Sequence, residues 1–231
     1  LLEYHEEQAK NSRWIRCKVA DLQMEPLSQS SPLTGNLSAF AKGTSQEAIE
    51  DTAENLGPAM RVDGALYPVR MTAYKSLLDR AKIGGTALPK LSRESLAGVL
   101  NECLKLHSAD ALSLIRDEKI SAVHSGDEVD YSVLPINELL KVLQAKLDER
   151  FSGNEFGSGY CDHALTSASW KMPGQKEDLL GTYAKVLADQ GKATMAAKLM
   201  PGIRFVTSDT GVASAKVSAL LLNGGHSIHI G

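Results

Sequence analysis

The stretch ALSLIRDEKISAVHSGDEVDYSVLPINELLKVLQAKLDERF, residues 111–151, decides the fold class of this chain. It begins with two short apolar runs, 111–116 and 119–125, and the polar pair Asp117-Glu118 between them predicts a tight hairpin turn. It ends in a predicted helix, because leucines recur at helical spacing at positions 139, 140, 143 and 147 and Pro135 suits a helix start. A strand hairpin followed by a helix indicates an antiparallel sheet packed by helices.

Patterns typical of strands and of helices also occur on either side of this stretch. Alternation of apolar and polar residues predicts strands over 12–24 and 163–172, and on both sides of residues 209–211. Helical spacing predicts helices over 45–57, 72–82, 92–106 and 176–191. The face of helix 92–106 that we expect to be buried comprises Leu96, Val99, Leu100, Cys103 and Leu104. Because strands and helices do not alternate regularly, we predict an α+β fold with a largely antiparallel sheet, packed by several helices that include 92–106 and 136–150.

The length and the composition are those of an ordinary globular protein. With 231 residues, 43% of them hydrophobic, the chain can bury a sizeable core, and we expect one α+β domain over residues 1–231. Pro, Ser and Gly accumulate over residues 25–44, which predicts a mobile loop. The chain lacks an initiating Met and stops within an alternating pattern at HSIHIG, so we expect a fragment of a longer chain.

Net charge, cysteine content and hydropathy restrict the partners and the cellular compartment that we expect for the protein. The net charge of -3 argues against avid non-specific binding to nucleic acid, although it leaves room for a local basic patch. Three widely spaced cysteines, Cys17, Cys103 and Cys161, form no disulfide framework and favour a reducing, cytoplasmic location. No apolar run approaches the ~20 residues that span a bilayer, so we expect no membrane partner.

The tripeptide Asp209-Thr210-Gly211, within FVTSDTGVAS (205–214), is the one around which aspartic proteases build their catalytic carboxylates. Such an enzyme needs two carboxylates that share one proton. This chain has a single copy, preceded by Thr207-Ser208 in place of apolar residues. Because Asp, Thr and Gly favour turns, we predict a turn that joins two strands, and no catalytic role for Asp209.

Two further patterns suggest ligand binding. The first is a set of metal-ligating side chains at Cys161, His163, His226 and His229, which zinc would accept, although the spacings are loose. The second is the glycine-rich segment 153–159, GNEFGSG. A phosphate-binding loop needs a following helix and usually a Lys, whereas strand-like alternation follows here. We therefore predict that 153–159 is a flexible connector.

Basic residues are interleaved with an aromatic one on the strand expected at 12–24. Arg13, Arg16 and Lys18 could contact a nucleic-acid backbone while Trp14 stacks on a base. The plainer interpretation is that these residues form the solvent-exposed face of a strand, and the negative net charge of the chain favours it. We keep these four as candidate binding residues.

Three segments together resemble a known family: AYKSLLDRAKIGGTALPKLS, LNECL and LSLIRDEKISAVHSGDEVDYSVLPINELLKVL. The closing part, PGIRFVTSDTGVASAKVSALLLNGG, is similar too, and its matching residues are Pro201, Gly202, Ser208, Thr210, Gly211, Asn223 and Gly224. The family is that of phage- and plasmid-encoded proteins of unknown function. In the first part, Arg116, 122–125 and 137–140 occupy the matching positions. Two departures weaken the transfer of sites: SGDEVDY replaces the family's Arg-Tyr pair, and Leu222 replaces its Cys.

The resemblance implies a mobile-element protein in the cytoplasm of a bacterial host. The resemblance, together with the strand expected before residues 209–211, supplies further candidate binding residues: Arg116, Arg204, Ser208, Thr210 and Gly211. We expect a non-enzymatic binding protein without a cofactor, whose partner is DNA or a host protein of replication, recombination or defence. Two alternatives stay open, a zinc-dependent hydrolase that uses the Cys161, His163, His226 and His229 set, and a virion or assembly protein. The sequence does not fix the oligomeric state.

Overall fold

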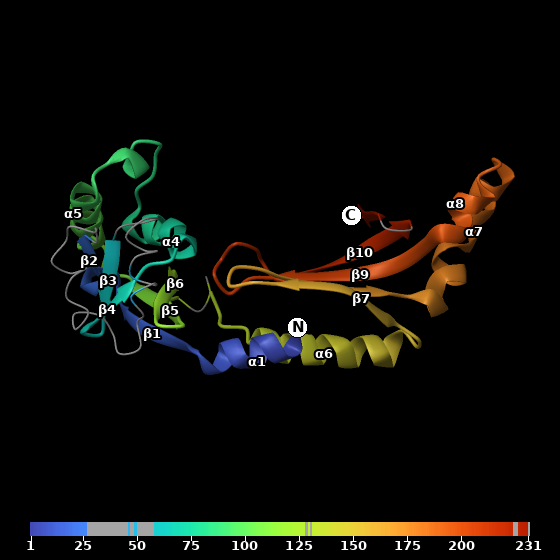
Figure 1. Ribbon diagram of the computed structural model, residues 1–231, viewed down its shortest axis with the longest axis horizontal. Helices are drawn as coiled ribbons and strands as arrows, with labels where there is room; N and C mark the ends of the chain where they lie inside the picture. The colour runs from blue at the N-terminus through green and yellow to red at the C-terminus, as the bar shows by residue number, and fades with distance from the viewer. Residues whose placement is uncertain are drawn as a thin grey trace. The chain divides into compact units, whose positions relative to one another are not determined.

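A computed structural model describes residues 1–26, 46, 49, 58–127, 129, 131–223 and 226–230, without the side chains of 227–230. Contacts group the chain into two compact units, which are described separately (Figure 1): unit 1, Leu1–His5 with Leu134–Gly231, and unit 2, Glu6–Val133. The expectation of a single domain stays a prediction. Most of the expected loop 25–44 lies outside the described residues, as does the helix expected at 45–57 apart from Gln46 and Ile49.

Unit 2 contains two antiparallel sheets of three strands each. The first has the order β1-β5-β6, with β1 Ser12–Lys18, β5 Asp110–Arg116 and β6 Lys119–Ser125. The second has the order β2-β3-β4, with β2 Gln23–Pro26, β3 Pro58–Val62 and β4 Ala65–Pro68. The short 3₁₀ helix Val19–Asp21 joins β1 to β2, so the strand expected over 12–24 is divided between the two sheets.

The hairpin predicted within 111–125 is confirmed. Strands β5 and β6 pair antiparallel, and Asp117 and Glu118 form the turn with φ values of 50° and 55°. Positive φ at both central positions gives the turn a twist that matches the right-handed twist of the strands. Two acidic residues hold this conformation without glycine, at some cost in backbone energy.

Two helices cover the sheets of unit 2. Helix α4 (Met71–Ala81) packs against β6, and α5 (Arg93–Leu104) packs against β2. Ser92 caps α5, because its hydroxyl accepts a hydrogen bond from the Ser95 amide at 3.2 Å. The buried face of α5 is confirmed at Leu96, Leu100 and Leu104. The expectation is wrong for Val99, which is 37% exposed because it lies at the margin of the apolar stripe.

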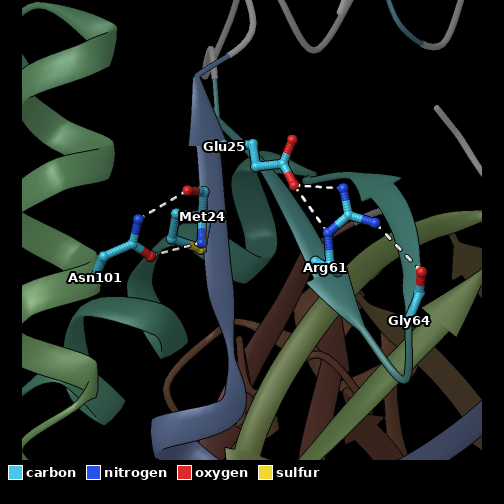
Figure 2. A network of polar contacts seen from close by, with 5 residues as sticks. All are labelled: Met24, Glu25, Arg61, Gly64 and Asn101. Atoms are coloured by element: carbon cyan, nitrogen blue, oxygen red, sulfur yellow. Dashed lines mark hydrogen bonds and ion pairs between the residues drawn. The ribbon is translucent and has the colours of Figure 1, made fainter.

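The amide of Asn101 connects α5 to strand β2 (Figure 2). Its Oδ1 accepts from the Met24 amide at 2.7 Å, and its Nδ2 donates to the Met24 carbonyl at 2.9 Å. On the next strand, Arg61 donates from Nε to Glu25 at 2.9 Å and from Nη1 to the Gly64 carbonyl at 3.3 Å. The Asn101 side chain therefore provides the pair of hydrogen bonds that a neighbouring strand would give to Met24.

Unit 1 is built on a five-stranded antiparallel sheet of order β11-β10-β9-β8-β7. Its strands are β7 Glu155–Cys161, β8 Thr166–Lys171, β9 Leu199–Thr207, β10 Lys216–Asn223 and β11 His226–Ile230. Helix α6 (Ile136–Arg150) runs along one face of this sheet (Figure 1). Leu140 and Leu147 of α6 pack there with Ala168, Trp170 and Phe205.

Three more α-helices are described, besides two short 3₁₀ helices at Leu88–Lys90 and Pro173–Gln175. Helix α7 (Lys176–Asp189) and α8 (Ala193–Lys198) lie together near one end of the sheet (Figure 1), where Leu187 and Ala196 pack with Leu199. Helix α1 (Leu2–Lys10) gives its first residues to unit 1. The α+β prediction is confirmed, since the described residues form six α-helices and three antiparallel sheets. Within the described residues, no helix is both long and apolar enough to cross a membrane.

The prediction of a connector at 153–159 is wrong, because most of that segment belongs to strand β7. The strand pairs with β8 over its whole length, with a register shift between Phe156 and Ser158. A Cβ at Gly159 would lie 2.9 Å from Cζ of Phe156, so glycine leaves room for that ring beside the strand. The glycines therefore serve close packing at a sheet edge, which composition alone does not distinguish from a loop.

Candidate binding site on the open sheet face

The alternation of side chains along β8 gives the five-stranded sheet two different faces. Thr166, Ala168 and Trp170 are buried, and the last two pack in the core beneath α6. Ser167, Ser169 and Lys171 point to the other face, because successive side chains of a strand lie on opposite sides. The strand predicted over 163–172 is thus confirmed as β8, at 166–171.

Strand pairing extends this second face, here called the open face, across four strands. Residues that pair directly share a face, and Arg204 pairs with both Ser169 and Ser218. The open face comprises Glu155, Ser158, Tyr160, Ser167, Ser169, Lys171, Met200, Gly202, Arg204, Val206, Lys216, Ser218, Leu220 and Leu222. Ser167, Gly202 and Leu220 are buried within it. The core residues beneath α6, α7 and α8 lie at the alternate positions, for example Phe205 and Leu199. The described helices of unit 1 therefore pack on the opposite face.

Arg204 occupies the middle of the open face. Its Nε donates to Oγ of Ser167 at 2.9 Å, which connects the guanidinium to strand β8. Beside it, the hydroxyls of Ser158 and Ser169 are hydrogen bonded at 2.8 Å. An arginine among serine hydroxyls is a donor-rich surface, and such surfaces suit oxygen-rich anions.

Three cations follow a diagonal across the open face. Lys171 is paired with Gly202, two residues before Arg204, and Lys216 is paired with Val206, two residues after it. At ~3.4 Å per residue and ~4.8 Å between strands, neighbouring cations of this diagonal have Cα atoms about 8 Å apart. Glu155 is paired with Lys171 and is the one acidic residue of the open face.

Tyr160 places an exposed aromatic ring at the border of the open face. The side chain is 55% exposed, and its hydroxyl donates to Oδ2 of Asp162 at 2.6 Å. This hydrogen bond raises the pKa of Tyr160 and lowers the pKa of Asp162. Two backbone amides, of Ala164 and Leu165, also donate to Asp162 at 2.7 Å. The ring is thus neutral at pH 7 and held in one orientation.

The basic residues predicted on β1 have partners within unit 2. These contacts are Arg13 with the Tyr67 hydroxyl and with Glu118, Arg16 with the Gly126 carbonyl, and Lys18 with Asp110. The Trp14 ring lies 5.9 Å from the rings of His124 and Tyr131, which stack on each other at 3.7 Å. These contacts compete with any phosphate or base that would bind to β1.

Apart from Arg204, the candidates taken from the family resemblance have hydrogen bonds or a backbone conformation that stabilise the fold. Arg116 is 6% exposed and donates from Nε to Oγ of Ser12 at 2.8 Å. Ser208 and Thr210 donate their hydroxyls to the Ala164 carbonyl at 2.6 and 3.2 Å. Gly211 has a φ of 80°, a conformation that favours glycine. The turn predicted at Asp209-Thr210-Gly211 is confirmed, and whether these residues bind a ligand stays a prediction.

The candidate metal ligands do not come together. The set comprises Cys161, His163, His226 and His229. Cys161 lies at the end of the sheet where β9 finishes with Thr207, whereas His226 lies at the end where β9 begins with Leu199. At ~3.4 Å per residue these ends are about 27 Å apart. Among the described side chains, no three His, Cys, Asp or Glu residues are grouped as metal ligands would be.

Sequence reasoning found only Arg204 of the open face. Ser167, Ser169 and Lys171 lie on one side of β8, but alternation alone does not show which side of a strand the core covers. Tyr160 and Ser158 were missed because β7 resembled a connector. Comparisons with protein-family models, curated proteins and solved structures found no match to this chain.

Proposed function

We propose that the protein is a non-enzymatic binding protein of a phage or plasmid and that it binds single-stranded DNA on the open face. The observation that carries the proposal is the diagonal of Lys171, Arg204 and Lys216 beside the exposed ring of Tyr160. The mobile-element setting rests on the resemblance of the quoted segments alone.

The arrangement suits a single strand for two physical reasons. A line of separated cations can follow one phosphate backbone, and the Tyr160 ring offers a surface on which a base can stack. Of the hydrogen-bonded hydroxyls of Ser158 and Ser169 beside Arg204, the one that accepts within the pair keeps its own proton and can donate it to a phosphate oxygen. A duplex presents its sequence inside grooves, which are entered by a protruding helix or ribbon, and the open face is a sheet surface. The modest net charge of -3 is compatible with such a local site.

Binding of a fluorescently labelled thymidine oligonucleotide, measured by anisotropy at low salt, tests the proposal. Arg204→Ala should weaken binding by roughly tenfold or more, because a charge-assisted hydrogen bond contributes about 1.5–3 kcal/mol. Lys171→Ala should weaken it less and should reduce the slope of log affinity against log salt by about 0.7, as expected for one lost phosphate contact. Tyr160→Ala should also weaken binding, while Tyr160→Phe should keep it.

Lys185→Ala is the matched control, because Lys185 is exposed on α7, away from the open face. It should leave affinity and salt slope nearly unchanged. A duplex of the same length should bind more weakly than the single strand. The proposal is wrong if the unmodified protein binds no single-stranded DNA, or if Lys185→Ala weakens binding as much as Arg204→Ala does.

A further inference from the structure

A groove lies on the side of the unit 1 sheet that faces α6, away from the open face. Its volume is about 560 Å³, within the range typical of small-molecule sites. Residues of α6, β7, β8 and the start of α1 form its walls. The walls comprise Leu1, Leu2, Leu140, Lys141, Gln144, Ala145, Asp148, Phe156 and Trp170.

The walls of this groove are mainly apolar and aromatic. Trp170 is nearly buried, at 3% exposure, and Phe156 stands edge-on to it with ring centroids 5.9 Å apart. Phe156 nevertheless remains 56% exposed and Leu2 37% exposed. An apolar molecule in the groove would cover these exposed side chains and remove their surface from water.

A polar network runs along the α6 wall and ends in a carboxylate. Nε1 of Trp170 donates to Oε1 of Gln144 at 2.7 Å, which satisfies the indole. Nε2 of Gln144 and Nδ2 of Asn154 each donate to Oδ1 of Asp148 at 2.8 Å. The Trp170 ring, the Gln144 amide and the Asp148 carboxylate are therefore fixed relative to one another.

The negative charge of Asp148 is not balanced by a cation of the described residues. Its donors are the neutral amides of Asn154 and Gln144, and these hydrogen bonds, that of Asn154 first, lower the pKa of Asp148. Lys141, the cation that also lines the groove, pairs instead with Glu138 at 3.2 Å. The groove thus combines an apolar wall with an anion that lacks a counter-charge.

We propose that this groove binds a small amphiphile that has an apolar body and one cationic nitrogen. The apolar body packs against Trp170, Phe156 and Leu140, and the cation pairs with Asp148. Charge complementarity selects the cation over an anion of equal length, and the exposed face of the Phe156 ring adds attraction for it. The proposal is independent of DNA binding, because it concerns the opposite side of the sheet.

The test compares three probes with the same eight-carbon chain: octylamine, octanol and octanoate. Each is titrated into the full chain carrying Trp14→Phe, so that tryptophan fluorescence reports on Trp170 beside the groove. Octylamine should bind about two- to fivefold more tightly than octanol, as expected for an ion pair with an exposed carboxylate, and octanoate should bind most weakly. The affinity for octylamine should not change between pH 8 and pH 5, because the lowered pKa keeps Asp148 charged and the amine stays protonated.

Two variants separate the charge from the cavity. Asp148→Asn keeps the acceptor oxygen and removes the charge, so octylamine should bind about two- to fivefold more weakly while octanol is unaffected. Ala145→Leu places a larger side chain in the groove and should weaken all three probes. Asp189→Asn, which removes an exposed carboxylate of α7, is the matched control and should change nothing. Equal affinities for the three probes, equal effects of Asp148→Asn on all of them, or no binding of any probe would each overturn the proposal.

Discussion

Ser208 holds the turn between β9 and β10 through a single hydroxyl group. Its Oγ donates to the Ala164 carbonyl at 2.6 Å and accepts from the amides of Thr210 and Val212, each at 3.2 Å. Ser208→Ala should therefore lower the free energy of unfolding by about 1–3 kcal/mol, because the amides of Thr210 and Val212 lose their acceptor, although the Ala164 carbonyl keeps the Thr210 hydroxyl. Urea denaturation measures the change. Ser214→Ala, at an exposed position of the same loop, should change it by less than about 0.5 kcal/mol. Equal losses for the two variants would show that the hydroxyl of Ser208 does not hold the turn.

At the scale of single elements, the side chain of Asn101 substitutes for a strand. It gives one donor and one acceptor to Met24 of β2 (Figure 2). Asn101→Asp keeps the acceptor and loses the donor, and it brings a carboxylate oxygen towards the Met24 carbonyl. We expect a loss of about 1–3 kcal/mol in the free energy of unfolding. The loss should decrease below pH 4, because a protonated carboxyl can donate again. Urea denaturation at pH 7 and pH 3.5, with Glu102→Gln at the exposed neighbouring position as control, checks both expectations. A loss that does not depend on pH would contradict this account.

The elements that the sequence predicts correctly are those whose structure depends on residues close together in the chain. The β5–β6 hairpin and helix α5 depend on residues close together in the chain, and both are confirmed. Strand β7 was missed because its conformation depends on pairing with β8 and on the Phe156 ring beside Gly159. The open face was missed for a related reason. Alternation shows that Ser167 and Trp170 lie on opposite faces, but only the packing of α6 shows which of the two faces is covered.

At the scale of the whole molecule, the chain returns to the unit in which it began. Leu1–His5 belongs with Leu134–Gly231, whereas Glu6–Val133 forms the other unit. His5 is 7% exposed, and its Nε2 lies 2.9 Å from Oγ1 of Thr166, at the start of β8. The first turn of α1 is thus bound to a strand more than one hundred residues later.

This arrangement predicts that the two units respond differently to a change at His5. His5→Ala favours the helical conformation of α1 but leaves the buried Thr166 hydroxyl without its partner, at a cost of about 1–3 kcal/mol. Amide hydrogen exchange followed by mass spectrometry should show roughly tenfold faster exchange in peptides of β8 and β9. Peptides that cover β5 and β6 should exchange at unchanged rates. Glu7→Ala, at an exposed position of α1, is the control and should leave both sets unchanged. If β5 and β6 accelerated together with β8 and β9, the chain would unfold as one cooperative body, as the single-domain prediction requires.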